Sequence, residues 1–147
     1  LTNIIGNPLD TTVAMHYLIF GGVLERYPDL KFVLSHGGAF AAAYAGRMDH
    51  AYGARPDCRE NISMPPSFYL EKFYPDSLVF TIEQLQYLIN RFGADHVLIG
   101  TDYPFDMGEY DPVEHVYQVP GLSSANRDLI CGGNALRLMH MTEDECK

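Results

Sequence analysis

The chain has 147 residues, of which 47% are hydrophobic and 20% are charged, and its formal net charge is −9. This composition is typical of a folded globular protein and excludes an intrinsically disordered chain. The negative charge disfavours binding to nucleic-acid phosphates, and no uncharged run is long enough to span a bilayer. The length corresponds to one domain, so we expect residues 1–147 to form a single domain.

The first predicted element is an amphipathic helix over residues 9–26. Apolar side chains recur along it at helical spacing: Val13, Tyr17, Phe20 and Leu24. The polar residues at its start are candidate N-caps: Asp10, Thr11 and Thr12. Gly21 and Gly22 weaken the middle of this helix, because glycine is a poor helix former.

Two short apolar runs are typical of strands that are buried on both faces. They are LKFVLS over residues 30–35 and HVLIG over residues 96–100. A further strand is expected within residues 73–79. These runs alternate with segments of helical character, which predicts βα units and a parallel sheet.

The remaining helices are predicted from periodicity and from caps. Residues 39–52 are Ala-rich and helical, and residues 82–92 form a helix that Thr81 and Gln84 start as a capping box. Residues 111–119 and 134–139 are predicted to be short helices, and Ser124 is expected to cap another.

Two of the predicted strands end in a residue that can do chemistry. His36 follows LKFVLS and Asp102 follows HVLIGT. The carboxyl ends of parallel strands are where such sheets bind ligands, in open sheets and in barrels alike. We therefore take His36 and Asp102 as the main functional candidates.

Each candidate also has a structural interpretation. His36 is a possible metal ligand or general acid/base, or its ring is satisfied by a loop carbonyl. Asp102 is a possible metal ligand or proton acceptor, or it is a turn residue before Pro104. Arg47 and Arg55 are possible clamps for a carboxylate, or they are solvated surface residues.

Several common enzyme motifs do not occur in the sequence. It has no GxGxxG fingerprint, P-loop, HExxH motif, CxxC pair or GxSxG elbow. This argues against Rossmann dehydrogenases, P-loop nucleotide enzymes, zincins and α/β-hydrolases.

Four segments together resemble one known family. They are FGGVLERYPDLKFVLSHGGAF, AGRMDHAYGARPD, LIGTDYPF and GGNALRLM. In this order and at these separations they resemble the amidohydrolase-related, metal-dependent decarboxylases, most closely the aminocarboxymuconate semialdehyde decarboxylase branch. The resemblance runs from about Gly6 to Met139 and implies a (β/α)8 TIM barrel.

The resemblance also implies roles for the candidate residues. His36 matches an active-site histidine that acts as acid/base beside a metal-bound water, and Asp102 matches an aspartate that is a metal ligand. Arg47 matches an arginine that reaches into the neighbouring subunit to hold a substrate carboxylate. Arg55 matches a further arginine of the pattern, which we assign to substrate binding.

Part of the family's metal site has no counterpart in the sequence. The family's first strand supplies a His-x-His pair and its fifth strand another histidine, and no HxH occurs here. We therefore expect the chain to be the C-terminal portion of the barrel, strands 6–8 with their helices. A complete barrel needs about 250 residues. Because a catalytic zinc typically wants three protein ligands, we expect the chain alone to be inactive.

The resemblance predicts a metal-dependent, non-oxidative decarboxylase, a C–C lyase, that acts on an unsaturated or aromatic-derived carboxylate. Zinc is the expected cofactor, with manganese as the alternative, and a homodimer through the Arg47 region is expected. A hydrolase of the same superfamily and a non-catalytic fragment that serves as an interaction module remain alternatives. The odd set of cysteines, Cys58, Cys131 and Cys146, suits free thiols in the cytoplasm.

Overall fold

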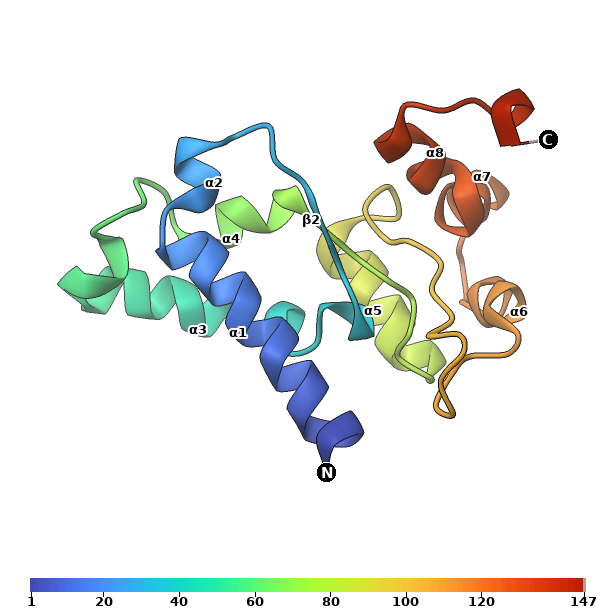
Figure 1. Ribbon diagram of the computed structural model, residues 1–147, viewed down its shortest axis with the longest axis horizontal. Helices are drawn as coiled ribbons and strands as arrows, with labels where there is room; N and C mark the ends of the chain where they lie inside the picture. The colour runs from blue at the N-terminus through green and yellow to red at the C-terminus, as the bar shows by residue number, and fades with distance from the viewer. Residues whose placement is uncertain (147) are drawn as a thin grey trace. The chain divides into compact units, whose positions relative to one another are not determined.

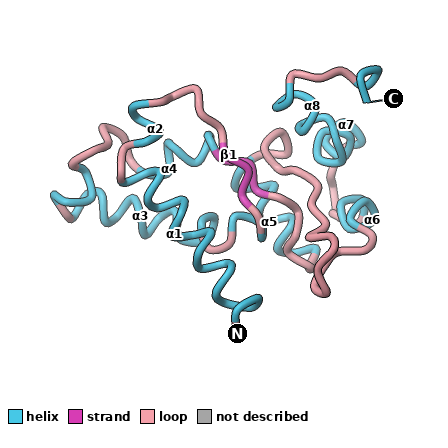
Figure 2. Tube along the Cα trace, in the orientation of Figure 1, coloured by secondary structure: helices cyan, strands magenta, loops and turns pink. Residues whose placement is uncertain are grey.

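The computed structural model describes residues 1–146, with the side chain of Cys146 outside the described part. The chain divides into two compact units, residues 1–74 and 75–147. Figure 1 shows the course of the chain, and Figure 2 shows that helices and loops make up most of it. The single domain expected from the length stays a prediction.

The first unit is built mainly of helices, together with β1 and the first two residues of β2. Its elements are η1 (Thr2–Gly6), α1 (Asn7–Phe20), α2 (Val23–Arg26), β1 (Phe32–Leu34), η2 (His36–Gly38), α3 (Ala41–Ala54), η3 (Pro56–Arg59), α4 (Pro66–Tyr69), η4 (Leu70–Lys72) and β2 (Phe73–Pro75). Strands β1 and β2 are hydrogen-bonded neighbours. Met15 and Ile19 of α1 are fully buried, as is Phe73 of β2, so these apolar side chains form the centre of the unit.

The helix predicted over residues 9–26 is divided at the two glycines. Gly22 has φ 69°, and a Cβ there would lie 2.4 Å from the carbonyl oxygen of Asn61. Only glycine satisfies both the left-handed backbone and this close approach. The predicted N-caps are wrong, because α1 already begins at Asn7 and Asp10, Thr11 and Thr12 lie inside it.

Strand β1 corresponds to the LKFVLS run but is not buried on both faces. Leu34 is buried, whereas Val33 is 61% exposed. Alternate residues of a strand point to opposite faces. The prediction of two buried faces is therefore wrong for this chain, in which the face of Val33 is open.

The second unit contains the remaining helices. They are α5 (Ile82–Phe92), α6 (Pro112–Tyr117), α7 (Ser124–Asp128), η5 (Leu129–Gly133), α8 (Asn134–Met139) and η6 (Glu143–Cys146). The bounds predicted for α5 and α8 are confirmed. Half of the predicted α5 capping box is present, because Gln84 N donates to Thr81 Oγ1 at 3.3 Å. The Gln84 side chain accepts from the Thr81 hydroxyl at 3.3 Å and not from the Thr81 backbone N–H that a capping box requires.

Two predictions in this unit need correction. The cap of α7 is Ser123 and not Ser124, since Ser123 Oγ accepts from Asn126 N at 3.2 Å. The HVLIG strand is reduced to a parallel bridge between Asp76 and Leu98, in which Leu98 N donates to Pro75 O at 2.9 Å. The apolar run was identified correctly, but a single bridge does not make a regular strand.

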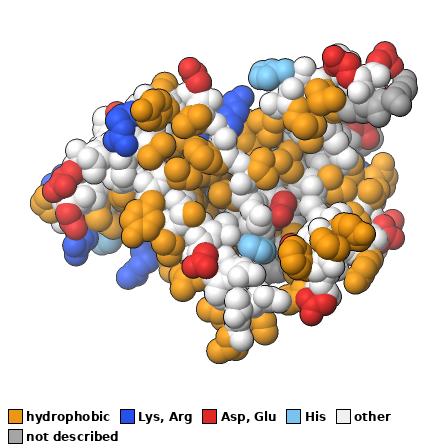
Figure 3. Space-filling view, viewed as in Figure 1, with side chains coloured by type: hydrophobic (Ala, Val, Ile, Leu, Met, Phe, Trp, Pro, Cys, Tyr) orange, Lys and Arg blue, Asp and Glu red, His pale blue; other side chains and the backbone are white. Residues whose placement is uncertain are grey.

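The surface carries many apolar side chains, as the space-filling view shows (Figure 3). In the first unit, one row follows η1 and α1 at intervals of four residues: Ile5, Leu9, Val13 and Tyr17. This spacing places them on one side of the helix. In the described part of the chain, no helix has both the length and the hydropathy that a membrane span requires.

Candidate active site

His36 lies in a strained turn that directly follows β1. Four consecutive residues have positive φ angles: His36 at 61°, Gly37 at 62°, Gly38 at 69° and Ala39 at 51°. A non-glycine residue costs roughly 1–2 kcal/mol in the left-handed region, and such conformations persist only where the surroundings enforce them. Because the two central residues are glycines, only His36 and Ala39 carry this strain.

Helix α1 holds this turn at both ends. Thr12 is buried, and its Oγ1 accepts a hydrogen bond from Phe40 N at 3.1 Å while it donates to Pro8 O at 2.9 Å. On the other side of the turn, Thr11 Oγ1 lies 3.1 Å from His36 Nδ1. The structural interpretation of His36 expected its ring to bond a loop carbonyl. In the structure, the partner of Nδ1 is instead the hydroxyl of Thr11.

Asp102 belongs to the second unit and also has a left-handed backbone, with φ 55°. Its loop is closed by its own hydrogen bonds, since Phe105 N donates to Asp102 O at 2.9 Å and Glu109 N donates to Thr101 O at 2.8 Å. The carboxylate of Asp102 is half-buried and has no hydrogen-bond or ion-pair partner among the described residues. A carboxylate in this state is available to a ligand.

Arg47 and Arg55 lie on and just after α3, and they line one groove of about 530 Å³ between α1 and α3. The rest of its lining is mostly apolar: Leu9, Thr12, His16, Phe20, Phe40, Tyr44, Met48, Ala51 and Cys58. Arg47 is exposed and has no ion-pair partner within the described chain. The groove thus combines apolar walls with an available guanidinium.

Arg55 differs from Arg47 because its guanidinium is already engaged. Its Nε and Nη2 donate to the two carboxylate oxygens of Asp57 at 3.2 and 2.7 Å. The hydrogen bond to Asp57 raises the pKa of Arg55 and lowers that of the Asp57 carboxyl. Both side chains are exposed, so water screens the pair, and Asp57 occupies the Nε–Nη2 edge of the Arg55 guanidinium.

The four candidates are divided between the two units. His36, Arg47 and Arg55 belong to the first unit, and Asp102 belongs to the second. Within the first unit, the groove takes in both arginines, whereas His36 is not among its lining residues. Their assignment as site residues stays a prediction.

The described residues do not make up a complete metal site. They contain no group of three or more histidine, cysteine, aspartate or glutamate side chains placed to hold one ion. A catalytic zinc typically has three protein ligands, so the carboxylate of Asp102 by itself is not enough to hold the metal.

Sequence reasoning missed several polar residues that shape these segments. It took Thr11 and Thr12 as caps, whereas they hold the His36 turn. It also gave no role to Asn134, which is fully buried and whose Nδ2 donates to Ala94 O and Val97 O, both at 2.8 Å. No local pattern predicts these contacts, because each joins residues more than 20 positions apart.

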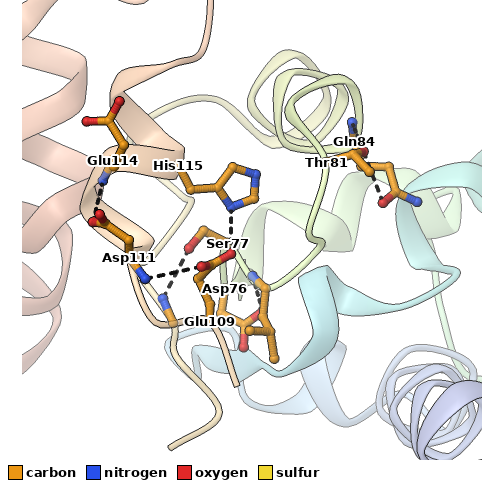
Figure 4. A network of polar contacts seen from close by, with 10 residues as sticks. Asp76, Ser77, Thr81, Gln84, Glu109, Asp111, Glu114 and His115 are labelled. Carbon is orange, nitrogen blue, oxygen red and sulfur yellow. Dashed lines mark hydrogen bonds and ion pairs between the residues drawn. The ribbon is translucent and has the colours of Figure 1, made fainter. Parts of the chain in front are cut away.

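A second polar cluster surrounds His115 on α6 (Figure 4). The ring is 8% exposed, and neither nitrogen has a hydrogen-bond partner among the described residues. Nδ1 lies 3.6 Å from Glu109 Oε2, while Glu109 Oε1 accepts from Asp111 N at 3.2 Å. The His115 ring is therefore a buried polar group of the second unit.

Comparison with known proteins identifies the family. The family model described as Amidohydrolase matches residues 5–140. The 2-amino-3-carboxymuconate-6-semialdehyde decarboxylase of Dictyostelium discoideum is 39% identical over 137 residues, which are 92% of this chain and 38% of that protein. The chain therefore spans well under half the length of this relative.

Solved structures give the same result for the fold. The 5-carboxyvanillate decarboxylase of Sphingomonas paucimobilis matches with a TM-score of 0.81 and 26% identity, over 92% of this chain and 41% of that one. A dihydroxybenzoic acid decarboxylase of Polaromonas, solved with manganese and the inhibitor 2-nitroresorcinol, matches with a TM-score of 0.78 and 26% identity, over 90% and 40%.

These matches define the class as an α/β chain that corresponds to part of an amidohydrolase-type decarboxylase barrel. The chain belongs to the amidohydrolase family, in which its relatives are decarboxylases. The resemblance inferred from the sequence is thereby confirmed. That the chain corresponds to strands 6–8 stays a prediction.

Proposed function

We propose that this chain is the C-terminal part of a metal-dependent, non-oxidative decarboxylase, a C–C lyase. The substrate class is an unsaturated or aromatic-derived carboxylate of the 2-amino-3-carboxymuconate 6-semialdehyde type. The observation that carries the proposal is the 39% identity to a decarboxylase of that name over 92% of the chain. The bound manganese of the Polaromonas relative supports a divalent metal, with zinc as the ion that we infer.

We propose that His36 moves a proton during the reaction. One ring nitrogen is engaged by Thr11, so the other is free to exchange a proton with substrate or water. The strained turn supports this role, because positive-φ residues that the surroundings hold in place are often found at active sites. Asp102 is proposed as one ligand of the metal, since its carboxylate is free within the described chain.

Arg47 is proposed to bind the substrate carboxylate. A guanidinium presents two parallel N–H groups to a carboxylate and neutralises its charge. Arg47 is exposed and unpaired within the described chain, whereas Arg55 is held by Asp57. The structure thus favours Arg47 as the primary carboxylate-binding residue and Arg55 as a secondary one.

We further propose a homodimer through the Arg47 region. The groove between α1 and α3 and the exposed apolar row on η1 and α1 support an interface here. In such a dimer, Arg47 of one subunit would serve the site of its partner. We also expect the protein in the cytoplasm, which agrees with Cys58 and Cys131 as free thiols.

A chimaera tests the proposed activity. The segment of the Dictyostelium relative that this chain matches is replaced by the chain, and the product is loaded with Zn²⁺ or Mn²⁺. We expect carbon dioxide release from 2-amino-3-carboxymuconate 6-semialdehyde. His36→Asn is expected to remove that release, and asparagine is the appropriate substitute because it tolerates a left-handed backbone.

The same assay separates the alternatives. Substrate consumption without carbon dioxide would favour hydrolysis, which is the activity that the family description, Amidohydrolase, suggests. A folded, metal-loaded chimaera without turnover would favour a non-catalytic fragment. Dihydroxybenzoic acid and 5-carboxyvanillate serve as second substrates, because related structures belong to decarboxylases with those names.

A further inference from the structure

We propose that Thr11 is a positioning residue for His36, and this inference rests on the proposed decarboxylase function. The hydroxyl of Thr11 lies 3.1 Å from His36 Nδ1 and engages that nitrogen. Nε2 thereby becomes the nitrogen that exchanges protons with substrate. Which nitrogen of a histidine works is set by the bond that the other nitrogen makes.

The first step of the argument is the chemistry of the hydroxyl. A threonine hydroxyl both donates and accepts, whereas imidazole Nδ1 is an acceptor or a donor depending on the protonation state. Thr11 therefore keeps its hydrogen bond when His36 gains or loses a proton. A backbone carbonyl cannot do this, because it only accepts.

The second step is the rigidity of the two elements. Thr11 lies within α1, and Thr12 beside it fixes Phe40 N by a hydrogen bond of 3.1 Å. The two threonines thus hold both sides of the strained turn, one through the His36 ring and one through the backbone. A ring held only by its own left-handed backbone would be free to rotate about its side-chain bonds.

The third step separates Thr11 from a purely structural residue. Thr12 is buried, and both its hydrogen bonds go to the backbone, so it acts on the fold. Thr11 is only half-buried, and the one hydrogen bond of its side chain in the described chain is to the imidazole ring. Its hydroxyl therefore serves His36 rather than the core.

The first experiment observes the ring nitrogens without any need for activity. The 147-residue chain is labelled with ¹⁵N, and His36→Asn identifies the His36 signals among those of the six histidines. We expect Thr11→Val, which removes the hydroxyl but keeps the shape, to move the His36 Nδ1 resonance. Thr11→Ser is expected to keep it, and Thr2→Val, at an exposed threonine of the same unit, is the control.

The second experiment measures turnover in the metal-loaded chimaera. We expect Thr11→Val to lower kcat about tenfold with little change in KM, and Thr11→Ser to restore it within about twofold, in line with the loss of other orienting hydrogen bonds. An inactive parent chimaera would overturn the proposed decarboxylase function, while the resonance experiment would still test the contact. An unchanged Nδ1 resonance in folded Thr11→Val, or Thr11→Ser behaving like Thr11→Val, would overturn the positioning role.

Discussion

Thr12 of α1 bonds the backbone of Phe40, 28 residues further along the chain, at 3.1 Å. This single hydroxyl connects the first helix to the end of the turn that carries His36. The hydroxyl also donates to Pro8 O, so both of its hydrogen-bonding functions are used. The conformation of the His36 turn therefore depends on a residue that is remote in sequence.

Thr12→Val is expected to destabilise the chain by about 1–3 kcal/mol, because it leaves Phe40 N without its partner in a part-buried place. Chemical denaturation followed by circular dichroism measures the change. Thr12→Ser keeps the hydroxyl and should retain most of the stability. A Thr12→Val variant as stable as the parent, with the loss confined to Thr12→Ser, would mean that the methyl group, and not the hydrogen bond, matters.

Asn134→Leu is expected to cost about 2–3 kcal/mol, since it removes the donor that satisfies two carbonyls, Ala94 O and Val97 O. These carbonyls flank the start of the HVLIG run, so this segment should lose amide protection first in hydrogen exchange. Asn90→Ala, at an exposed position of α5, is the matched control and should change stability little. Unaltered protection of residues 94–98 would contradict the role of Asn134.

Glu25 should make stability depend on acid pH. Hydrogen bonds from Ser63 and then Tyr69 lower its pKa below the ordinary value of 4.5, and the side chain is exposed. A lowered folded-state pKa stabilises the protein above the unfolded pKa, and this contribution is lost as the pH falls through the folded pKa. We therefore expect Glu25→Gln to flatten the fall in stability below about pH 4.5. A titration of unfolding free energy against pH checks this, and parallel curves for both proteins would refute it.

His115→Leu is expected to raise the free energy of unfolding by about 1 kcal/mol, because a buried polar ring without hydrogen bonds carries a desolvation cost. Urea denaturation at pH 8 measures it. Glu109→Gln is the companion variant and tests the 3.6 Å contact with Nδ1. If both variants destabilise the chain, the His115–Glu109 pair stabilises the fold and the prediction fails.

We expect that the chain alone does not bind one Zn²⁺ or Mn²⁺ ion tightly, because the described residues lack a set of three ligands. Isothermal titration calorimetry measures this directly. Asp102→Asn should change little in the isolated chain but should abolish metal loading in the chimaera. Tight zinc binding and substrate turnover by the unmodified 147-residue chain would refute the interpretation as an incomplete site.

Local signals in the sequence determined part of this protein. The i, i+3, i+4, i+7 spacing and the Thr81 cap gave the bounds of α5, and the grouped motifs around His36 and Asp102 gave the family. Both are short-range features. The period of a helix and its capping residue depend on residues within one or two turns, and a motif is defined by the order of its residues in the sequence.

Tertiary structure alone decided the rest. The break at Gly22 depends on the approach of Asn61, and the exposure of Val33 depends on which elements cover its strand. The sequence predicted Thr11 and Thr12 to be helix caps, but their hydroxyls bond residues that lie 25 and 28 positions away. Such contacts form only when distant segments pack, because the sequence around a hydroxyl does not indicate which residue will become its hydrogen-bond partner.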